Sequence, residues 1–401
     1  MHQRQLPRAG LHTLALACMA AIAYVDPGNF AVNVAAGAEH GYTLVWVVVG
    51  ASLTASVVQY LAAKLGIATG RSLAENCRTA YGRRWRLVLW LQAELVVIMT
   101  DLAELVGGAF ALQLLFGIPL VWGAMIVAGF GFLALGLRIR GYEGFRPVLL
   151  ILFALIVALL VAQLLLAGVD GPAFARGLVP SPMDGSAAVL AVGIIGATVM
   201  PHALHFHSAV AREDSRPREA AKLASVARAR RAIAIAMSFA AVANVALVLI
   251  AARLPVEAAA GLGEAYAALG ATFGRLAAVG FGLALLASGL ASTIVGVYTG
   301  QVVMQGFWQR PISLWLRRLL AVVPPLVILL AGVDPTAALV WSQVVLSFGL
   351  PASLIPLVLL TSRRPVMGRL VNARSTIVVA GLATVMICGL DLYLLVELFA
   401  G

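Results

Sequence analysis

The chain has 401 residues, of which 62% are hydrophobic and 11% charged, and it carries a formal net charge of +11. With a mean hydropathy of +0.99, this composition excludes an ordinary soluble protein and indicates a polytopic membrane protein. The positive charges lie in short stretches between apolar segments, so they give little support to nucleic-acid binding. The three cysteines are far apart in the sequence, which argues against a disulfide framework or a zinc cluster.

The hydropathy of the chain predicts an all-α fold with eleven membrane-spanning helices in a single membrane domain, residues 1–401. The predicted segments cover residues about 11–38, 43–65, 87–115, 120–137, 147–168, 186–211, 231–252, 276–304, 315–331, 336–361 and 375–399.

The first segment is interrupted by the sequence Asp26-Pro27-Gly28-Asn29. A carboxylate and a Pro-Gly pair are tolerated in hydrocarbon only where the freed backbone lines a cavity or a site. Because proline has no N–H, Pro27 leaves the carbonyl of Ala23 without its helical donor. The break therefore offers the Asp26 carboxylate, the Asn29 amide oxygen and the Ala23 carbonyl, which suit a hard or borderline cation.

The third segment carries three carboxylates, Glu94, Asp101 and Glu104, spaced by seven and three residues. This spacing puts them on one helical face, and such a stripe inside a membrane segment is typical of a proton relay. Glu94 lies nearest the cytoplasmic end, where an interfacial salt bridge is an equally good interpretation.

The sixth segment is interrupted at Met200-Pro201-His202, and Pro201 frees the carbonyl of Ala197 by the same argument. A methionine thioether is a soft, neutral donor that favours transition metals over Mg²⁺ and Ca²⁺. The alternative is that Met200 only fills the core, but its place directly before the helix-breaking proline favours a ligand.

Three histidines follow this second break, and their spacing does not place them all on one helical face. We expect His202 to respond to protons beside the site and His207 to line the intracellular path, whereas His205 is a buried or interfacial residue. A metallohydrolase is disfavoured because the chain has no HExxH and no acidic residue between these histidines. Asn244, a lone amide in the seventh segment, is either a helix–helix hydrogen bond or a gate residue.

The positive residues predict the topology. If the N-terminus is cytoplasmic, all of the 28 lysines and arginines except Arg176, Arg253 and Arg275 fall on the cytoplasmic side. This places the C-terminus outside, and it makes residues 212–231 a solvated basic loop near anionic lipid. Breaks in the first and sixth segments predict a five-plus-five inverted repeat of the LeuT-like kind. Repeat one covers about 11–168, repeat two about 186–361, and an extra helix follows at about 375–399.

Several stretches together carry a family resemblance: AYVDPGNFAVNVAAGAEHGY, AELVVIMTDLAELVG, GIIGATVMPHALHFHS, ALLASGLASTIVGVYTGQVVMQGF and LWLRRL. Over nearly its whole length the chain resembles the Nramp family of proton-coupled divalent metal transporters. The resemblance implies that the metal is held by Asp26, Asn29, Met200, Ala23 and Ala197, with Gln343 approaching in some states.

The same resemblance assigns Asp101 and Glu104 to the proton path, with Arg317 and Arg318 near its cytoplasmic end. Many family members have asparagine after the MPH motif and tyrosine soon afterwards, where this chain has Ala203 and His205. Magnesium-selective relatives lose the methionine that this chain keeps.

We therefore expect a secondary transporter, not an enzyme, that imports Mn²⁺, Fe²⁺, Co²⁺ or Cd²⁺ together with protons, in contact with membrane lipid. Asp26 carries the charge needed for a divalent ion, and we expect it to belong to the proton pathway as well, releasing or accepting a proton as the metal binds. No resident cofactor and no obligate protein partner are expected. The short loops favour a bacterial-type plasma membrane. The alternative function is a sodium- or proton-coupled symporter of amino acids or other organic solutes with the same fold. It would dock a substrate carboxylate on half-helix N-termini without an anionic aspartate at the break.

Overall fold

The computed structural model describes residues 5–137, 146–215, 219–308 and 313–400, and this part of the chain is helical without strands. The helices of the first half are α1 Gln5–Ile22, η1 Ala23–Val25, α2 Pro27–His40, α3 Val45–Thr69, α4 Leu73–Ala80, α5 Arg83–Phe116, α6 Leu120–Leu137, α7 Arg146–Ala167 and α8 Gly171–Gly177. Those of the second half are α9 Gly185–Thr198, α10 Pro201–Ala211, η4 Arg212–Asp214, α11 Glu219–Ala251, η5 Val256–Ala260, α12 Leu262–Phe273, α13 Arg275–Phe307, α14 Leu314–Leu330, α15 Pro335–Thr361, α16 Arg364–Met367, η6 Gly368–Leu370 and α17 Arg374–Ala400.

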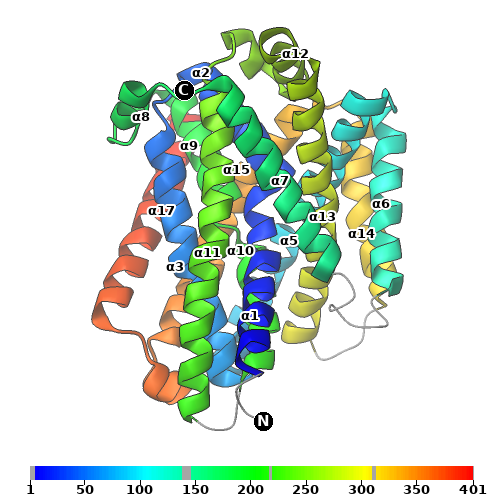
Figure 1. The fold of residues 1–401 in the computed structure, drawn as a ribbon. Coiled ribbons are helices and arrows are strands. Elements are labelled where there is room, and N and C mark those ends of the chain that lie inside the picture. Colours follow the sequence, from blue (N-terminus) through cyan, green and yellow to red (C-terminus); the bar gives the residue numbers. More distant parts are fainter. Residues whose placement is uncertain (1–4, 138–145, 216–218, 309–312, 401) are drawn as a thin grey trace.

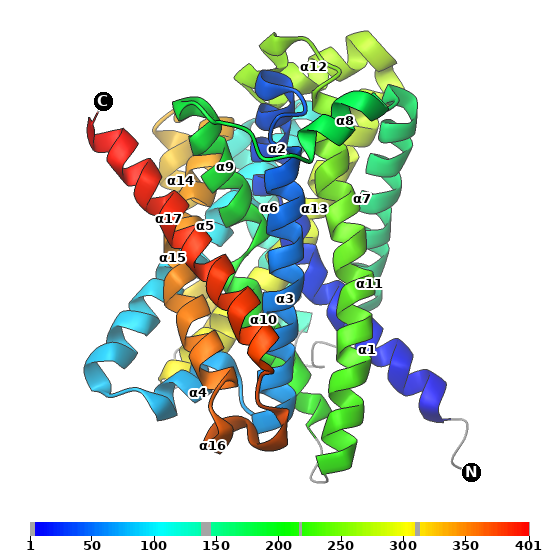
Figure 2. The ribbon, with the colours of Figure 1, turned by 90° about the vertical axis from the view of Figure 1, so that its left-hand side faces the viewer.

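Each predicted membrane segment corresponds to one helix, or to a pair of helices where a break was predicted. Among the described residues, eight spans are long and apolar enough to cross a membrane, and the bent α1–α2 pair makes a ninth. The two remaining predicted segments, α6 and α14, are shorter apolar helices. The long helices run side by side between two ends of the bundle, with the start of α1 at one end and the end of α17 at the other (Figures 1 and 2).

Both predicted breaks are present. Pro27 occupies the first turn of α2, where its missing N–H costs nothing, and the axis bends by 51° between the two half-helices. At the second break α9 ends at Thr198, Met200 is extended (φ −77°, ψ 120°), and Pro201 begins α10. The two prolines thus start new half-helices instead of merely kinking continuous ones.

Small residues let the central helices approach closely, as is usual between membrane helices. A Cβ on Gly107 of α5 would collide with the ring of Pro27, and a Cβ on Gly289 of α13 would meet the backbone of Gly108 on α5. Helix α11 packs along α1, α2 and α3, while α15 packs along α5 and α9. The two breaks are therefore enclosed by α5, α11, α13 and α15.

One predicted boundary is wrong. Residues 212–231 were expected to form a loop, yet η4 covers Arg212–Asp214 and α11 begins at Glu219, twelve residues earlier than predicted. Residues 219–231 read EAAKLASVARARR, and alanine, arginine, lysine and glutamate are strong helix formers. Hydropathy alone ended the segment too early because the helix continues beyond the apolar part.

Short helices that the hydropathy did not predict close the two ends. Helix α4 begins with a capping box in which Ser72 and Glu75 bond each other's backbone N–H. Helices α8 and α12 lie at the opposite end (Figure 2). The prediction of a single domain with the stated repeat boundaries stays a prediction.

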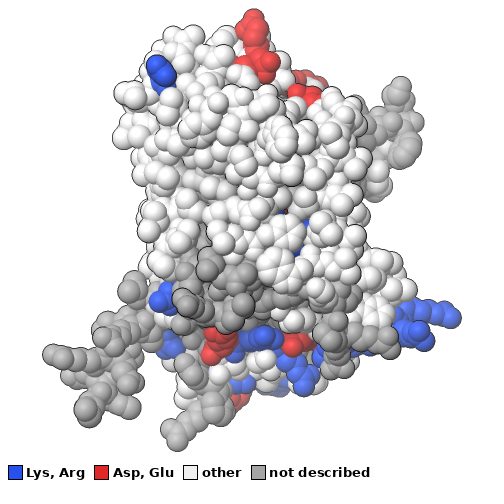
Figure 3. Space-filling view, turned by 90° about the vertical axis from the view of Figure 1, so that its right-hand side faces the viewer, with Lys and Arg blue, Asp and Glu red and all other residues white. Residues whose placement is uncertain are grey.

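Lysine and arginine gather at the end of the bundle where α1 begins (Figure 3). This agrees with the clustering predicted from the sequence, whereas the assignment of that end to the cytoplasm stays a prediction. Six of the arginines on which the prediction relied lie outside the described residues: Arg4, Arg138, Arg140, Arg216, Arg218 and Arg310.

Candidate functional site

The two helix breaks are joined by one side-chain amide. Nδ2 of Asn29 donates to Oδ1 of Asp26 and to the backbone carbonyl of Ala197, each at 2.9 Å. Oδ1 of Asp26 also accepts from the backbone N–H of Asn29 at 2.8 Å, which caps α2. The other carboxylate oxygen, Oδ2, is buried and has no hydrogen-bond partner among the described residues. An unpartnered anionic oxygen in the protein interior is costly unless it is paired or binds a cation.

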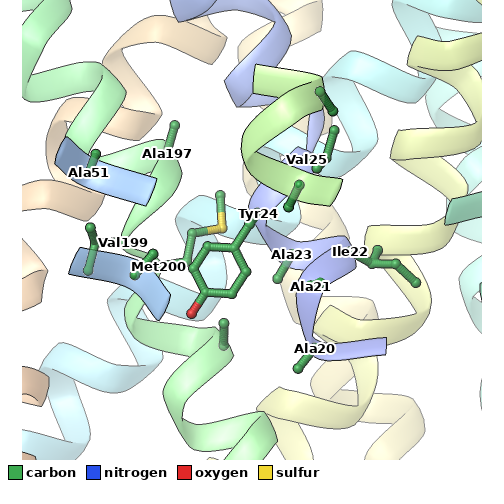
Figure 4. Packing of buried hydrophobic residues seen from close by; sticks show 14 of the residues in the cluster. Ala20, Ala21, Ile22, Ala23, Tyr24, Val25, Ala51, Ala197, Val199 and Met200 are labelled. Carbon is green, nitrogen blue, oxygen red and sulfur yellow. The ribbon is translucent and has the colours of Figure 1, made fainter. Parts of the chain in front are cut away.

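The other predicted ligands lie at the same place. Ala23 and Met200 are fully buried, and Figure 4 shows the Met200 side chain of the second break beside the ring of Tyr24, which follows Ala23 in the first. Within the described part of the chain, Oδ1 of Asn29 has only a long contact, 3.5 Å, from the hydroxyl of Thr198. The breaks thus bring together one carboxylate, one amide, one backbone carbonyl and one thioether.

Gln343 of α15 lies against both breaks. A Cβ on Gly28 would collide with the Gln343 side chain, and a Cβ on Gly196 would collide with the Gln343 carbonyl. Nε2 of Gln343 donates to the hydroxyl of Ser342 at 3.1 Å, while its Oε1 is buried without a partner among the described residues. At these two glycines α15 lies directly against both breaks.

Backbone carbonyls of the first break are held by neighbouring helices. Asn244 of α11 donates to the carbonyl of Tyr24 at 2.7 Å and accepts from Asn33 at 3.0 Å. Ser288 of α13 donates to the carbonyl of Val25 at 2.6 Å. Asn244 thus forms the helix–helix hydrogen bond that was one of its two predicted roles, while the gate role stays a prediction. Sequence reasoning missed Ser288 and Asn33, although each is a polar residue in a predicted membrane segment.

The carboxylates of α5 meet the two arginines of α14 in register. Asp101 pairs with Arg318, and both side chains are almost completely buried. Glu94 pairs with Arg317 at 3.4 Å. Glu104 is fully buried, and neither of its carboxylate oxygens has a hydrogen-bond partner among the described residues. Along α5 the series therefore passes from a partly exposed ion pair through a buried one to an unpaired carboxyl.

Three glycines on neighbouring helices provide the space that these charged side chains occupy. A Cβ on Gly296 of α13 would stand 2.7 Å from a carboxylate oxygen of Glu104. A Cβ on Gly300, one turn further, would collide with the guanidinium of Arg317, and one on Gly131 of α6 would press on that of Arg318. The absence of side chains at these positions keeps the charged series in place.

His202 links this charged series to the second break. Its Nδ1 lies 3.2 Å from the hydroxyl of Thr100, which is next to Asp101 on α5. The hydroxyl of Thr100 also lies 2.9 Å from the Val96 carbonyl, and which group donates in the contact with His202 depends on the tautomer of the imidazole. Nε2 of His202 is buried without a hydrogen-bond partner among the described residues.

The other two histidines lie further along α10. His205 is buried, and its ring lies 6.2 Å from that of Phe307. His207 is buried as well, and its Nδ1 has no partner among the described residues. In the described part of the chain, neither side chain forms a hydrogen bond with residues of the two breaks, so the buried interpretation of His205 fits its surroundings.

A fourth buried carboxylate was missed. Asp391 of α17 accepts a 2.6 Å hydrogen bond from Ser347, one turn after Gln343 on α15, and its second oxygen has no partner among the described residues. A lone aspartate in the last predicted segment could have been noticed in the sequence. Its bond to Ser347 attaches the extra helix to the helix that touches both breaks.

The chemistry of the donor set follows from its composition. No group of three or more histidine, cysteine, aspartate or glutamate side chains in the described ranges could hold a metal ion, so the breaks supply a single anion with neutral donors. Mixed oxygen and sulfur ligation favours borderline divalent ions over purely oxygen-seeking ones. Such a set suits an ion that is bound and then released.

The arrangement of the helices is the LeuT-like fold of membrane transporters. A solved nucleobase-cation-symport-1 family transporter in a closed conformation superposes with a TM-score of 0.61 over 86% of this chain and 77% of that chain, at 16% identity. At that identity the likeness shows the fold alone.

Closer relatives place the chain within this class. Residues 17–397 match the Nramp family, described as natural resistance-associated macrophage protein-like. A Yersinia pestis (strain Pestoides F) protein named divalent metal cation transporter MntH is 42% identical over 401 residues, covering 99% of this chain and 97% of the relative. A solved Eremococcus coleocola manganese transporter has a TM-score of 0.87 and 29% identity, over 98% of this chain and 88% of that chain. The chain belongs to the Nramp family of multi-pass membrane proteins, which confirms the resemblance and the expectation that it is not an enzyme.

Proposed function

We propose that this protein imports divalent transition metal ions, Mn²⁺ and Fe²⁺ above all, with protons, by alternating access across a bacterial-type plasma membrane. The observation that carries the proposal is the meeting of the two breaks. The amide of Asn29 joins the Asp26 carboxylate to the Ala197 carbonyl, three residues before the Met200 thioether. The names of the manganese and divalent metal transporters that this chain resembles support the same substrate class.

The site has the properties that a transported cation needs. The single carboxylate of Asp26 offsets part of the divalent charge, while the neutral donors add ligation without binding the ion too tightly for release. Every predicted ligand is buried in this conformation, so the ion needs a rearrangement to enter and leave. Movement of the half-helices against α15, where Gln343 touches the first break, would alternately open the site.

The proton route that we propose follows α5 away from the site. Glu104, without a partner among the described residues, can take up and release a proton, and the Asp101–Arg318 and Glu94–Arg317 pairs continue the route toward the positively charged end of the bundle. His202 stands between this route and the second break through its contact with Thr100, and we place His207 on the intracellular path.

Uptake by proteoliposomes that contain the purified protein tests this function. Mn²⁺ should accumulate faster than in empty liposomes, and an inward proton gradient should increase the rate. Saturable uptake of an amino acid with sodium, without Mn²⁺ uptake, would instead support the symporter of the same fold.

Replacing Glu104 with glutamine should reduce proton transport without reducing metal binding. Glutamine keeps the shape but cannot carry a proton, so metal-linked acidification of the lumen should fall several-fold while Cd²⁺ binding changes little. Acidification is followed with a trapped pH dye. The matched control is Glu257→Gln at the exposed η5. If Glu104→Gln loses metal affinity and keeps its proton flux, the assignment is wrong.

Replacing Met200 with alanine should change the choice of metal. Loss of the thioether leaves an oxygen-dominated site, so Cd²⁺ should lose about tenfold in affinity, equivalent to about 1.4 kcal/mol, while part of the Mn²⁺ uptake remains. Ca²⁺ should then inhibit Mn²⁺ uptake better than it does in the wild type.

The control for this competition assay is Met237→Ala, which removes another fully buried methionine in α11. Equal inhibition of wild type and Met200→Ala by Ca²⁺, with unchanged Cd²⁺ potency, would make Met200 a packing residue.

A further inference from the structure

A groove of about 340 Å³ lies on the outside of the bundle between α3, α11 and α17, away from the two breaks. Figure 2 faces this side, with α3 between α17 and α11. Its polar lining comprises Ser56 and Tyr60 of α3, Arg230 of α11, and Ser375 and Thr376 of α17. None of the predicted metal or proton residues takes part in it.

The charge in this groove is positive. Arg230 is exposed, and no acidic side chain in the described part of the chain forms an ion pair with it. A second cation stands behind Tyr60, because Nζ of Lys64 lies 5.6 Å from the centre of that ring. The hydrogen-bond partner of Lys64 is the neutral amide of Asn372, at 2.9 Å, so its charge also remains available to attract an anion.

The groove is cationic at one end and largely apolar at the other, where the hydroxyl of Ser56 already donates to the Ser52 carbonyl of its own helix at 2.9 Å. Helices α11 and α17 both start at the positively charged end of the bundle (Figure 2), and on each the polar lining residue precedes apolar ones. On α11, Arg230 is followed by Ile233 and Ala234 in the groove. On α17, Ser375 and Thr376 are followed by Val379 in the groove.

The exposed surfaces beyond the groove continue this pattern. Ile235 and Phe239 of α11 are 48% and 50% exposed, and Leu382 and Val385 of α17 are 65% and 70% exposed. In a membrane protein such surfaces face acyl chains, so the apolar end of the groove opens toward the hydrocarbon and the cationic end toward the headgroups.

We propose that this groove is a binding site for one anionic phospholipid, with its phosphate at Arg230, Tyr60 and the hydroxyls of Ser375 and Thr376. The start of one acyl chain occupies the apolar end, over Ile233, Ala234 and Val379. A free phosphate would leave that end unfilled, and a zwitterionic lipid would gain less from Arg230 and Lys64. Basic pockets between membrane helices recognise anionic headgroups in this way.

Native mass spectrometry of the full-length protein, with phosphatidylglycerol or phosphatidylcholine of the same acyl chains, tests the proposal. Wild type should retain phosphatidylglycerol in preference. Arg230→Gln should reduce that retention about fivefold, the effect of about 1 kcal/mol for one cation near a lipid surface, and Arg230→Lys should restore most of it. The matched control is Arg231→Gln, an exposed neighbour about 100° around the helix, which should change retention little.

A second variant tests the acyl contact. Ala234→Phe should fill the apolar end of the groove and so weaken the binding of phosphatidylglycerol. It should not change any binding of inorganic phosphate. Equal losses in Arg230→Gln and Arg231→Gln, or phosphatidylcholine retained as well as phosphatidylglycerol, would overturn the proposal. So would displacement of phosphatidylglycerol by inorganic phosphate at equal concentration, or a dimer of this chain that excludes the lipid.

Discussion

Replacing Asp26 with asparagine should abolish metal uptake and leave the protein folded. Asp26 is the only formal anion at the two breaks, and its Oδ2 has no hydrogen-bond partner among the described residues. Asparagine has nearly the same shape and is an equally good N-cap, so it can keep the 2.8 Å bond to the backbone N–H of Asn29. It cannot supply the negative charge that a divalent ion needs. The initial rate of Mn²⁺ uptake should fall more than about a hundredfold, as expected if about 3 kcal/mol of ion binding is lost.

The chain contains a matched control for this change. Asp334 caps α15 with the same geometry, accepting from the backbone N–H of Ala337 at 2.7 Å, but it is exposed at the end of the bundle. Asp334→Asn should keep both its thermal stability and its uptake. Wild-type Mn²⁺ uptake by Asp26→Asn would refute the assignment of the metal site, and a loss of folding in Asp26→Asn alone would make the residue structural.

Replacing Arg318 with methionine should destabilise the protein by about 3–5 kcal/mol, because it leaves the buried Asp101 carboxylate without its cation. The side chains of Arg318 and Asp101 are only 2% and 1% exposed, so water cannot replace the lost partner. Adding Asp101→Asn to Arg318→Met removes the unpaired charge and should recover most of the loss. Unfolding of the detergent-solubilised protein, measured for both single variants and the double variant, gives the coupling between the two residues.

A surface ion pair provides the comparison. Arg369 and Glu219 stand 3.7 Å apart with side chains 77% and 54% exposed, and Arg369→Met should change stability by about 0–1 kcal/mol. If the Arg318→Met, Asp101→Asn double variant is as unstable as Arg318→Met alone, the loss comes from packing of the arginine side chain and not from the unpaired charge.

The pairing of Arg318 with Asp101 shows which part of this charged series could be predicted from the sequence. The spacing of Glu94, Asp101 and Glu104 predicted a stripe of carboxylates on one face, and the family resemblance brought Arg317 and Arg318 to the same route. Which arginine pairs with which carboxylate depends on how α14 lies against α5. The need for small residues at Gly131 and Gly300 became visible only when the guanidinium groups were placed beside them.

The boundary of α11, in contrast, was predicted wrongly although the sequence contains the signal for it. Its apolar part was predicted correctly, but the preceding basic residues were assigned to a loop because hydropathy was the only signal used. Helix propensity in the run from Glu219 to Arg231 carries the helix beyond the apolar part. Helix propensity, unlike hydropathy, therefore predicts about the first three turns of this helix.

The sequence by itself determined the features that arise from covalent structure and local composition. Pro27 and Pro201 lack an N–H and each follows a candidate ligand, Asp26 or Met200, so they located both breaks. Pro324, Pro325, Pro351 and Pro356 also stand in apolar segments but lie inside the helices α14 and α15. Runs of apolar residues located the helices. The tertiary structure alone decided how the breaks are joined. Asn29 reaches Ala197 across 168 residues of sequence, and Asn244 reaches Tyr24 across 220. Buried polar groups must find partners wherever the packed helices offer them, and that choice is made by the three-dimensional arrangement of segments that are far apart in the chain.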